Sequence, residues 1–466
     1  MEVFLDRAAT RLLAPTLWRG VRQAQQLNRP IIVSVVEPIL TFDAIDLFER
    51  GAAVAAERVL WSHPSEEFAL VGFGAAAVIE AGPERRFSAA AEAWQALRVG
   101  ALHEGPRGVP GLGPLLLGGF AFDGERPATG LWDGFPAGRL VLPRLTFTLQ
   151  QERGWLTHTL QVRPDDDAAA LAEAQAALLD DVMTAPAVRG EAAAPTTLHE
   201  LRSASDWQAD VAKAAQAVGT GEMQKVVLAR AVQLEADQVF QAGRALRYLS
   251  ANYHGCYLFA VARGERCFLG ATPEQLLRLR HGEVRTMSLA GSIRRGRTPE
   301  EDQQLGQALQ DSVKDRNEHT VVVQAMVEAL YATCASLTVG PTGLLKLGNI
   351  QHLCTPIIGP VADGQTLLDL VERLHPTPAV GGRPRAVALH WIRQHEQLDR
   401  GWYAGPVGWV DERGEGEFAV ALRSALLHGD RATLFAGCGI MADSDPEREY
   451  VESSLKLKPM LTALTQ

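Results

Sequence analysis

The sequence lacks the features that several common protein classes require. Its five cysteines form no CxxC pair and show no zinc-type spacing, so neither a disulfide framework nor a cysteine-based metal site is predicted. No run approaches the ~18 apolar residues of a membrane-spanning helix. The N-terminus also lacks the basic-then-apolar order of a signal peptide. We therefore expect a soluble, cytoplasmic protein with no membrane partner.

Basic charge and the common catalytic motifs are scarce as well. The formal net charge is -10 and no basic patch is visible, which argues against a nucleic-acid partner. The sequence contains no P-loop, no complete dinucleotide fingerprint, no HExxH and no GxSxG elbow. Its twelve histidines are dispersed. If a metal binds, carboxylates must hold it, and they prefer a hard cation such as Mg²⁺.

What is present is a long chain in which strand-like and helix-like runs alternate. At 466 residues it can bury a large core. In the first half, residues 29–40, 139–150 and 154–162 are predicted to be strands, and 165–183 a helix. Residues 184–199, with prolines and small residues, are the best candidate for a linker.

The second half mixes helices with strands that are close neighbours in the sequence. A long helix is predicted over 298–331, with Thr298 as its cap and Pro299 in its first position. A terminal helix follows Ser444 or Asp445. This order favours an α+β fold over a doubly wound parallel sheet. The other predicted elements are helices at 205–218 and 239–251 and strands at 225–234, 256–262, 266–270, 406–411, 416–427 and 432–437.

The terminal helix carries acids and a lysine on one stripe. Glu449, Glu452 and Lys456 follow an i, i+3, i+7 spacing. The stripe is either a solvated surface or half of a cation site. Glu318 stands directly before an apolar run and by itself indicates little. Together, Glu318 and Glu452 would supply the one or two carboxylates that Mg²⁺ usually takes.

Two further residues are candidates for acid-base chemistry. Lys225 begins a strand, where it either stays in water or enters a desolvated site and acts as a general base. Glu274 follows a Thr-Pro turn. It is either an acid favoured at a helix start or a general acid with a raised pKa.

An arginine and two glycine-containing loops suggest an anionic ligand. Arg423 lies in an apolar run that is predicted to be a strand, so it needs an anionic partner, either a ligand carboxylate or a neighbouring acid. Residues 286–296 and 375–384 are loops whose small side chains let backbone amides approach a ligand.

The ordered set of these motifs resembles the chorismate-utilising enzymes, in particular their isochorismate synthase branch. The resemblance covers about residues 200–466 and extends weakly to 114–123 and 140–147. The motifs that carry it, in chain order, are KVVLAR, ATPEQLL, SLAGS, DRNEH, HPTPAVGG, WYAGPVG, ALRSA and GCGI followed by SDPEREYVESSLK.

The resemblance implies a large α+β fold, a β-sheet sandwich surrounded by helices, with the active site in a cleft between its layers. Residues 1–195 would form the N-terminal half of this fold, and 196–466 the chorismate-binding catalytic region. The implied substrate is chorismate and the implied cofactor is Mg²⁺. A long N-terminal half is similar to enzymes of menaquinone biosynthesis rather than to those of siderophore biosynthesis.

The family's functional residues map onto this sequence one by one. Lys225 matches the base that activates water, and Glu274 the general acid. Glu318 and Glu452 match the metal ligands, and Glu449 is an outer or third contact. The residues that match the substrate site are Gly291, Ser292, His352, Ala379, Tyr403, Arg423, Gly437, Gly439 and Lys456.

Individual residues distinguish among the branches of the family. Lys225 and the absence of a PIKG motif disfavour the ammonia-using enzymes, so no glutamine amidotransferase partner is expected. Ala379 stands where salicylate synthases carry threonine, which favours release of isochorismate. A salicylate synthase is the alternative, and a non-catalytic ligand-binding subunit a second one. The sequence departs from the family pattern at Ser292, Cys438, Tyr450 and Ser453.

Overall fold

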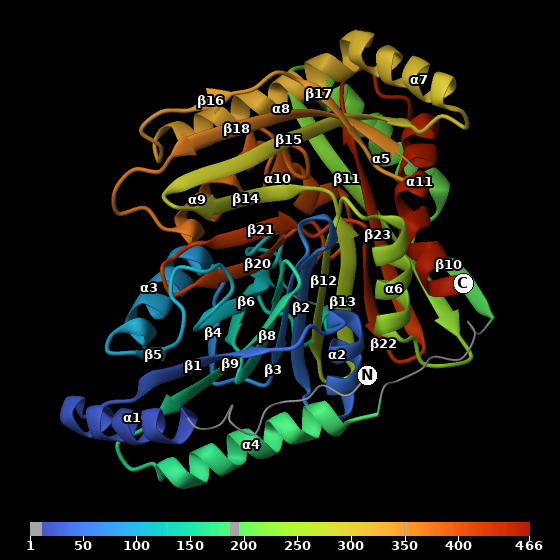
Figure 1. Cartoon of the computed structure of the whole chain (residues 1–466). Helices are drawn as coiled ribbons and strands as arrows, with labels where there is room; N and C mark the ends of the chain where they lie inside the picture. The colour runs from blue at the N-terminus through green and yellow to red at the C-terminus, as the bar shows by residue number, and fades with distance from the viewer. Residues whose placement is uncertain (1–11, 128, 187–194, 349) are drawn as a thin grey trace.

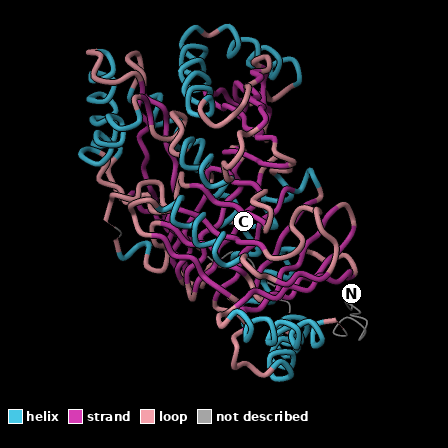
Figure 2. Tube along the Cα trace, turned by 90° about the vertical axis from the view of Figure 1, so that its left-hand side faces the viewer, coloured by secondary structure: helices cyan, strands magenta, loops and turns pink. Residues whose placement is uncertain are grey.

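The fold is a sandwich of two large sheets, seen here in a computed structural model. The structure describes residues 12–127, 129–186, 195–348 and 350–466. Strands fill the interior and helices cover the outside (Figure 1; Figure 2). The sheets pack through apolar side chains; the rings of Phe68 and Trp409, which come from different sheets, have centroids 5.7 Å apart. The predicted α+β sandwich is confirmed.

The larger sheet has 13 strands among the described residues and draws on both halves of the chain. Its strands are mostly antiparallel, and β1 pairs with β5 in parallel. β19 (Gly382–Arg383) joins it by pairing with β11. In spatial order the other strands are β10 (Thr196–Glu200), β11 (Lys225–Ala236), β23 (Arg431–Ile440), β22 (Ser424–His428), β13 (Arg266–Thr272), β12 (Tyr257–Arg263), β2 (Glu57–His63), β3 (Phe68–Phe73), β8 (Leu145–Gln150), β9 (Arg153–Val162), β1 (Ile31–Ile39) and β5 (Leu102–Glu104).

The smaller sheet has 10 strands among the described residues. β17 (Gly343–Lys346) pairs with β18 at its side. The other strands, in spatial order, are β16 (Thr338–Val339), β18 (Ile350–Pro360), β15 (Glu283–Arg294), β14 (Gln275–Arg280), β21 (Gly416–Val420), β20 (Pro406–Asp411), β6 (Leu115–Phe120), β7 (Gly138–Leu142) and β4 (Ala77–Ala81). Because both sheets take strands from both halves of the chain, the division at residue 195 stays a prediction.

The two helices that carry predicted site residues each pack on a strand that carries others. α8 (Val313–Tyr331) packs on β15, and α11 (Pro446–Thr465) packs on β23 (Figure 1). None of the described helices combines the length and the apolar composition needed to cross a bilayer. The remaining helices are α1 (Leu13–Leu27), α2 (Ala44–Arg50), α3 (Arg86–Arg98), α4 (Ala168–Thr184), α5 (Ala204–Gly219), α6 (Ala242–Asn252), α7 (Pro299–Asp311), α9 (Leu367–Leu374) and α10 (Arg385–His395), with short 3₁₀ helices at Gly51–Ala53, Pro64–Glu66 and Gly130–Trp132.

Three predicted elements are each split in two. Residues 139–150 form β7 and β8, which belong to different sheets, because Pro143 has no N–H to continue the ladder. The predicted helix 298–331 breaks at Ser312, whose backbone is extended and whose hydroxyl caps α8 by accepting from the Asp315 amide. The predicted strand 416–427 breaks at Arg423, where φ is 48°.

The predicted linker is partly wrong as well. Thr184 still belongs to α4, and the segment after residue 195 forms β10, an edge strand paired with β11. Residues 187–194 lie outside the described residues.

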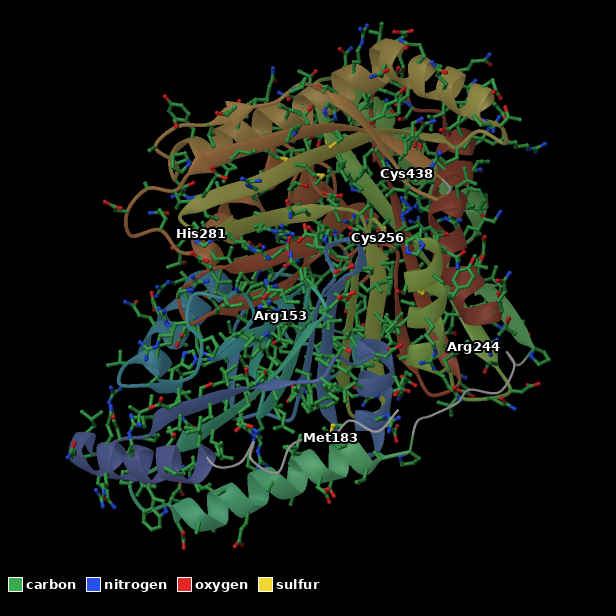
Figure 3. The ribbon with its side chains drawn as sticks, viewed as in Figure 1. Arg153, Met183, Arg244, Cys256, His281 and Cys438 are labelled. Atoms are coloured by element: carbon green, nitrogen blue, oxygen red, sulfur yellow. The ribbon has the colours of Figure 1, made fainter. Side chains whose placement is uncertain are left out.

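Helix starts follow the sequence closely. Thr298 caps α7 and Pro299 opens it, and Asp445, rather than Ser444, caps α11. All five cysteines are unpaired. Cys256 and Cys438 are labelled in Figure 3. Cys256 directly precedes β12, and Cys438 lies in β23 of the same, larger sheet.

Candidate active site

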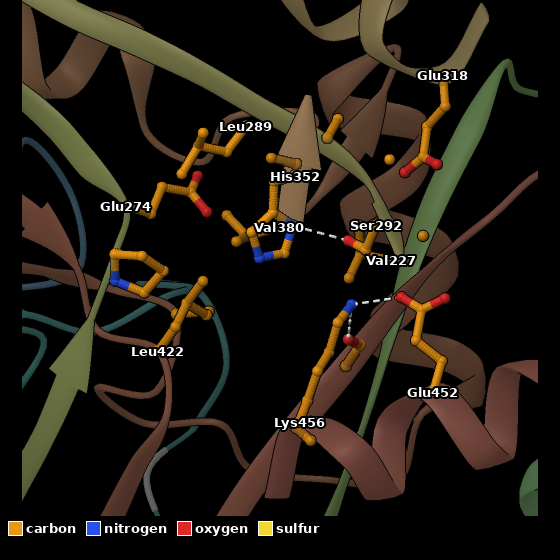
Figure 4. Close-up of a pocket in the computed structure, with 18 of the residues that line it drawn as sticks. Val227, Glu274, Leu289, Ser292, Glu318, His352, Val380, Leu422, Glu452 and Lys456 are labelled. Atoms are coloured by element: carbon orange, nitrogen blue, oxygen red, sulfur yellow. Dashed lines mark hydrogen bonds and ion pairs between the residues drawn. The ribbon is translucent and has the colours of Figure 1, made fainter. Parts of the chain in front are cut away.

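Every residue predicted for the site lines one pocket between the two sheets. The pocket is enclosed by α8, α11 and the strands β11, β15, β18 and β23. In the close-up, Glu318, Glu452 and Lys456 lie on one side of the space and Glu274 on the other (Figure 4). The roles assigned to these residues stay predictions, but their convergence is a property of the fold.

Glu274 occupies a position where the chain passes from one sheet to the other. β13 of the larger sheet ends at Thr272 and β14 of the smaller sheet begins at Gln275, so the helix start considered for Glu274 from the sequence is wrong. The Val420 amide donates to the Glu274 carbonyl, which fixes the crossing. The side chain is 7% exposed, and burial raises its pKa to about 7. A carboxyl with this pKa can hold a proton near neutral pH, as a general acid must.

Lys225 begins β11 and is buried in the pocket wall. Lys225 is 1% exposed, which rules out the solvated position considered from the sequence. Its Nζ donates to Glu318 Oε1 at 2.7 Å. β11 is held there by antiparallel pairing with β23 and β19. The amine is thus fixed at the base of the pocket, on the side of Glu318.

The acids of the proposed cation site come from two helices. Glu318 projects from α8, and Glu449 and Glu452 project from α11. Lys456 Nζ lies 2.7 Å from Glu452 Oε1 and donates to the Gly437 carbonyl at 3.0 Å. Burial disfavours the charged form of both side chains, but the attraction between their opposite charges is stronger. The pKa of Glu452 is therefore lowered and the pKa of Lys456 is raised.

The donor atoms around Glu452 fit a hard divalent cation. Carboxylate oxygens of Glu449 and Glu452 and the Cys438 sulfur all lie within 4.8 Å of one another. The Cys438 thiol is engaged in another contact, since its Sγ donates a hydrogen bond to the backbone carbonyl of Glu449 at 3.3 Å. The oxygens that remain are the ligands that Mg²⁺ prefers. Burial, followed by the charge of Glu452, raises the pKa of Glu449, as expected for acids that share a site.

Arg423 also lies at a crossing between sheets. The chain leaves the smaller sheet at Val420 and enters the larger sheet at Ser424. The predicted mid-strand position is therefore wrong: Arg423 occupies a left-handed turn with φ of 48°. Its Nη1 is buried and has no hydrogen-bond partner among the described residues. An arginine donor left unpaired in a pocket is suited to an anionic ligand.

Tyr403 stands on the same wall and is 4% exposed. Its ring stacks on Phe435 of β23, with centroids 5.2 Å apart. Burial raises the pKa of its hydroxyl to about 12, so the group stays a neutral hydrogen-bond donor. Tyr403 and Arg423 can therefore both donate to an anion.

Three predicted site glycines lie close to other parts of the chain. An added Cβ at Gly439 would lie 2.6 Å from both Glu318 Oε1 and Lys225 Cε, so a side chain here would separate the two residues. The prediction of a loop over 286–296 is wrong, because these residues up to Arg294 belong to β15, paired with β18. Gly291 has φ of 75° at a bulge in this strand, and an added Cβ would lie 3.1 Å from Asp315. Gly437 packs similarly, with the Tyr403 hydroxyl 3.3 Å from its ideal Cβ.

Ser292 and His352 form a cross-strand pair on β15 and β18. Ser292 Oγ and His352 Nδ1 are 2.8 Å apart (Figure 4). His352 Nε2 is buried and has no partner among the described residues. Burial lowers the pKa of His352 to about 3, so its ring is neutral. Ala379 lines the pocket from the loop between α9 and β19.

Three charged residues of the pocket were missed by sequence reasoning. Lys314 and Asp315 stand near Glu318 in the first turn of α8, and Lys314 Nζ lies 3.4 Å from Glu449 Oε1. Helical spacing to Glu318 was the signal for Lys314. Arg400 is buried against Glu396 and donates to the carbonyls of Val227 and Val380. It therefore joins β11 to the loop that carries Ala379.

Comparison with known proteins identifies the family of this chain. The sequence model described as "Chorismate binding enzyme" matches residues 19–465. The chain belongs to this family. It is 41% identical over 457 residues to the salicylate biosynthesis isochorismate synthase of Pseudomonas aeruginosa, covering 97% of this chain and 94% of that protein. It is 36% identical over 453 residues to isochorismate synthase MenF of Bacillus subtilis, covering 96% of each chain.

A solved structure confirms the architecture of this chorismate binding enzyme. The menaquinone-specific isochorismate synthase MenF of Escherichia coli superposes with a TM-score of 0.81 at 27% identity, covering 98% of this chain and all of that one. The resemblance stated from the motifs is confirmed, and it extends well beyond residues 200–466. The N-terminal half, where the motifs were weak, shares the same fold.

Proposed function

We propose that this chain is an isochorismate synthase that reversibly converts chorismate to isochorismate. The observation that carries the proposal is the meeting, in one pocket, of a buried lysine, a buried carboxyl with a pKa of about 7 and acids suited to a cation. The names of the relatives with 41% and 36% identity support it.

The reaction exchanges one hydroxyl for another across the ring. Water attacks C2 while Lys225, as the neutral amine, takes its proton, and a C–O bond forms there. The ring double bonds shift and the C–O bond at C4 breaks. Glu274 gives its proton to the departing hydroxyl, which leaves as water. One water enters and one leaves, so the reaction is expected to lie near equilibrium.

Glu318 and Glu452, with Glu449, would hold Mg²⁺. The ion would neutralise the ring carboxylate of the substrate and orient the ring. Tyr403 and Arg423 would donate to the enolpyruvyl carboxylate, with Lys456 as a further cation. The remaining contacts of the substrate would come from Gly291, Ser292, His352, Ala379, Gly437 and Gly439.

The wider setting of the enzyme is part of the proposal. We place it in the cytoplasm, acting on chorismate as a small molecule without a glutamine amidotransferase, a membrane or a nucleic acid as partner. Its product would feed menaquinone biosynthesis or a siderophore route. One relative is named MenF, as is the menaquinone-specific enzyme of Escherichia coli, and the name of another refers to salicylate biosynthesis.

Incubation of the purified protein with chorismate and Mg²⁺, followed by chromatography of the products, tests the function. Isochorismate supports the proposal. Salicylate with pyruvate would identify a salicylate synthase instead, and unchanged chorismate a ligand-binding subunit.

A further inference from the structure

Each acid proposed to bind the cation already binds a lysine of the same chain. Glu318 Oε1 accepts from Lys225 Nζ at 2.7 Å, and Glu452 Oε1 lies 2.7 Å from Lys456 Nζ. Both pairs line the pocket, and the lysine of the first is 1% exposed. The carboxylates are therefore neutralised from inside the protein.

Two cations, an ammonium group and a divalent ion, repel each other strongly when both contact the same carboxylate oxygen. A bound Mg²⁺ lies about 2.1 Å from a carboxylate oxygen. An ammonium held by the same oxygen would be within a few ångströms of that ion, in a pocket where charges are poorly screened. The contact between Lys225 and Glu318 is also close, because Gly439 leaves no side chain between them. A cation that binds Glu318 through Oε1, alone or together with the second oxygen, must displace the lysine.

We propose that Lys225 and Lys456 are internal competitors of the divalent cation and set its affinity in the substrate-free protein. The proposal rests on the proposed function only for the identity of the cation-binding acids. It adds that the ion is bound weakly until the lysines have another partner.

An anionic substrate supplies that partner. A carboxylate of the substrate can accept a hydrogen bond from the ammonium group of Lys456. Lys456 then releases Glu452, which becomes free to bind the ion. Binding of the anion should then tighten binding of the cation. By linkage the cation tightens binding of the anion by the same factor.

Binding of Mn²⁺, followed through the electron paramagnetic resonance signal of the free ion, tests the competition without any turnover. We expect Lys225→Met and Lys456→Met each to bind Mn²⁺ about tenfold more tightly than the unaltered protein when chorismate is absent. Lys458→Met is the matched control, because Lys458 is exposed on the same helix and its loss changes the net charge equally. This control should bind Mn²⁺ as the unaltered protein does.

A second measurement covers the stability of the variants. Removal of Lys225 leaves Glu318 without its partner, so Lys225→Met should melt at a lower temperature and gain more from added Mn²⁺ than the unaltered protein. Lys225→Gln, which keeps a polar side chain, serves if the Met variant does not fold.

Two results would overturn the competition: unchanged or weaker Mn²⁺ binding in the lysine variants, or an equal gain in Lys458→Met. The fate of chorismate in the product assay is a separate result. Failure of the proposed function and failure of the competition are therefore distinguishable.

Discussion

Replacing Glu274 by glutamine should abolish catalysis and stabilise the protein at the same time. Glutamine has nearly the shape of glutamic acid but carries neither a transferable proton nor a charge. Loss of a general acid typically costs ~10²–10⁴-fold in rate. We expect turnover of chorismate to fall by at least about 100-fold.

The gain in stability follows from the raised pKa. Burial raises the pKa of Glu274 from its usual 4.5 to about 7, so between these values the folded state holds a proton that the unfolded state has released. Stability must therefore fall as pH rises through this window. At about 1.4 kcal/mol per pKa unit, the unaltered protein loses about 3 kcal/mol by pH 8. The glutamine variant does not.

The assay is urea denaturation of both proteins at pH 5 and at pH 8, beside the chromatographic assay of turnover. The variant should be more stable by about 3 kcal/mol at pH 8 and by much less at pH 5. Glu84→Gln, at an exposed position, should change neither turnover nor stability. Near-normal turnover would refute the role of Glu274 as the acid, and equal stability at pH 8 would refute its raised pKa.

Four other changes test the rest of the site. Lys225→Ala should lower turnover at least about 100-fold while chorismate still binds, as measured by calorimetry; normal turnover would exclude Lys225 as the base. Arg423→Ala should raise KM about tenfold or more with a smaller effect on kcat, because it removes a donor to the substrate carboxylate; an unchanged KM would contradict this. Gly439→Ala should abolish turnover with the fold kept by circular dichroism, whereas Gly255→Ala, with no atom within 4 Å of its ideal Cβ, should be silent. Chelation of divalent ions should stop turnover and Mg²⁺ should restore it; activity in the chelator would remove Glu318 as a metal ligand.

The sequence was a good guide where the signal is local. Caps and prolines placed the starts of α7 and α11 within a residue, because a capping side chain bonds to amides only two or three positions away. The predicted site residues were named through their motifs, and all of them line the pocket, whereas Lys314, Asp315 and Arg400 were missed.

It failed where the chain changes sheet. The runs 139–150 and 416–427 resume their apolar pattern after Pro143–Arg144 and after Arg423–Ser424, so each was predicted to be one strand. Pro143 was a local sign of the first break, but nothing local shows that the two parts of each run join different sheets. Which sheet a strand joins depends on packing with distant segments. The pairing of Lys225 with Glu318, 93 positions apart, was hidden for the same reason. Two of the crossings carry predicted site residues, Glu274 and Arg423, and both residues line the pocket between the sheets.

The charges of the pocket suggest why metal and substrate belong together. Its lining holds five side chains that can carry positive charge, Lys225, Lys314, Arg400, Arg423 and Lys456, and five acids, Glu274, Asp315, Glu318, Glu449 and Glu452. In the proposed reaction Lys225 would act as the neutral amine and Glu274 as the protonated acid, and moving one proton between them leaves the total charge unchanged. A dianionic substrate alone would upset this balance in a poorly solvated space, and so would Mg²⁺ alone. The two together add no net charge, so the pocket favours their joint binding over that of either one.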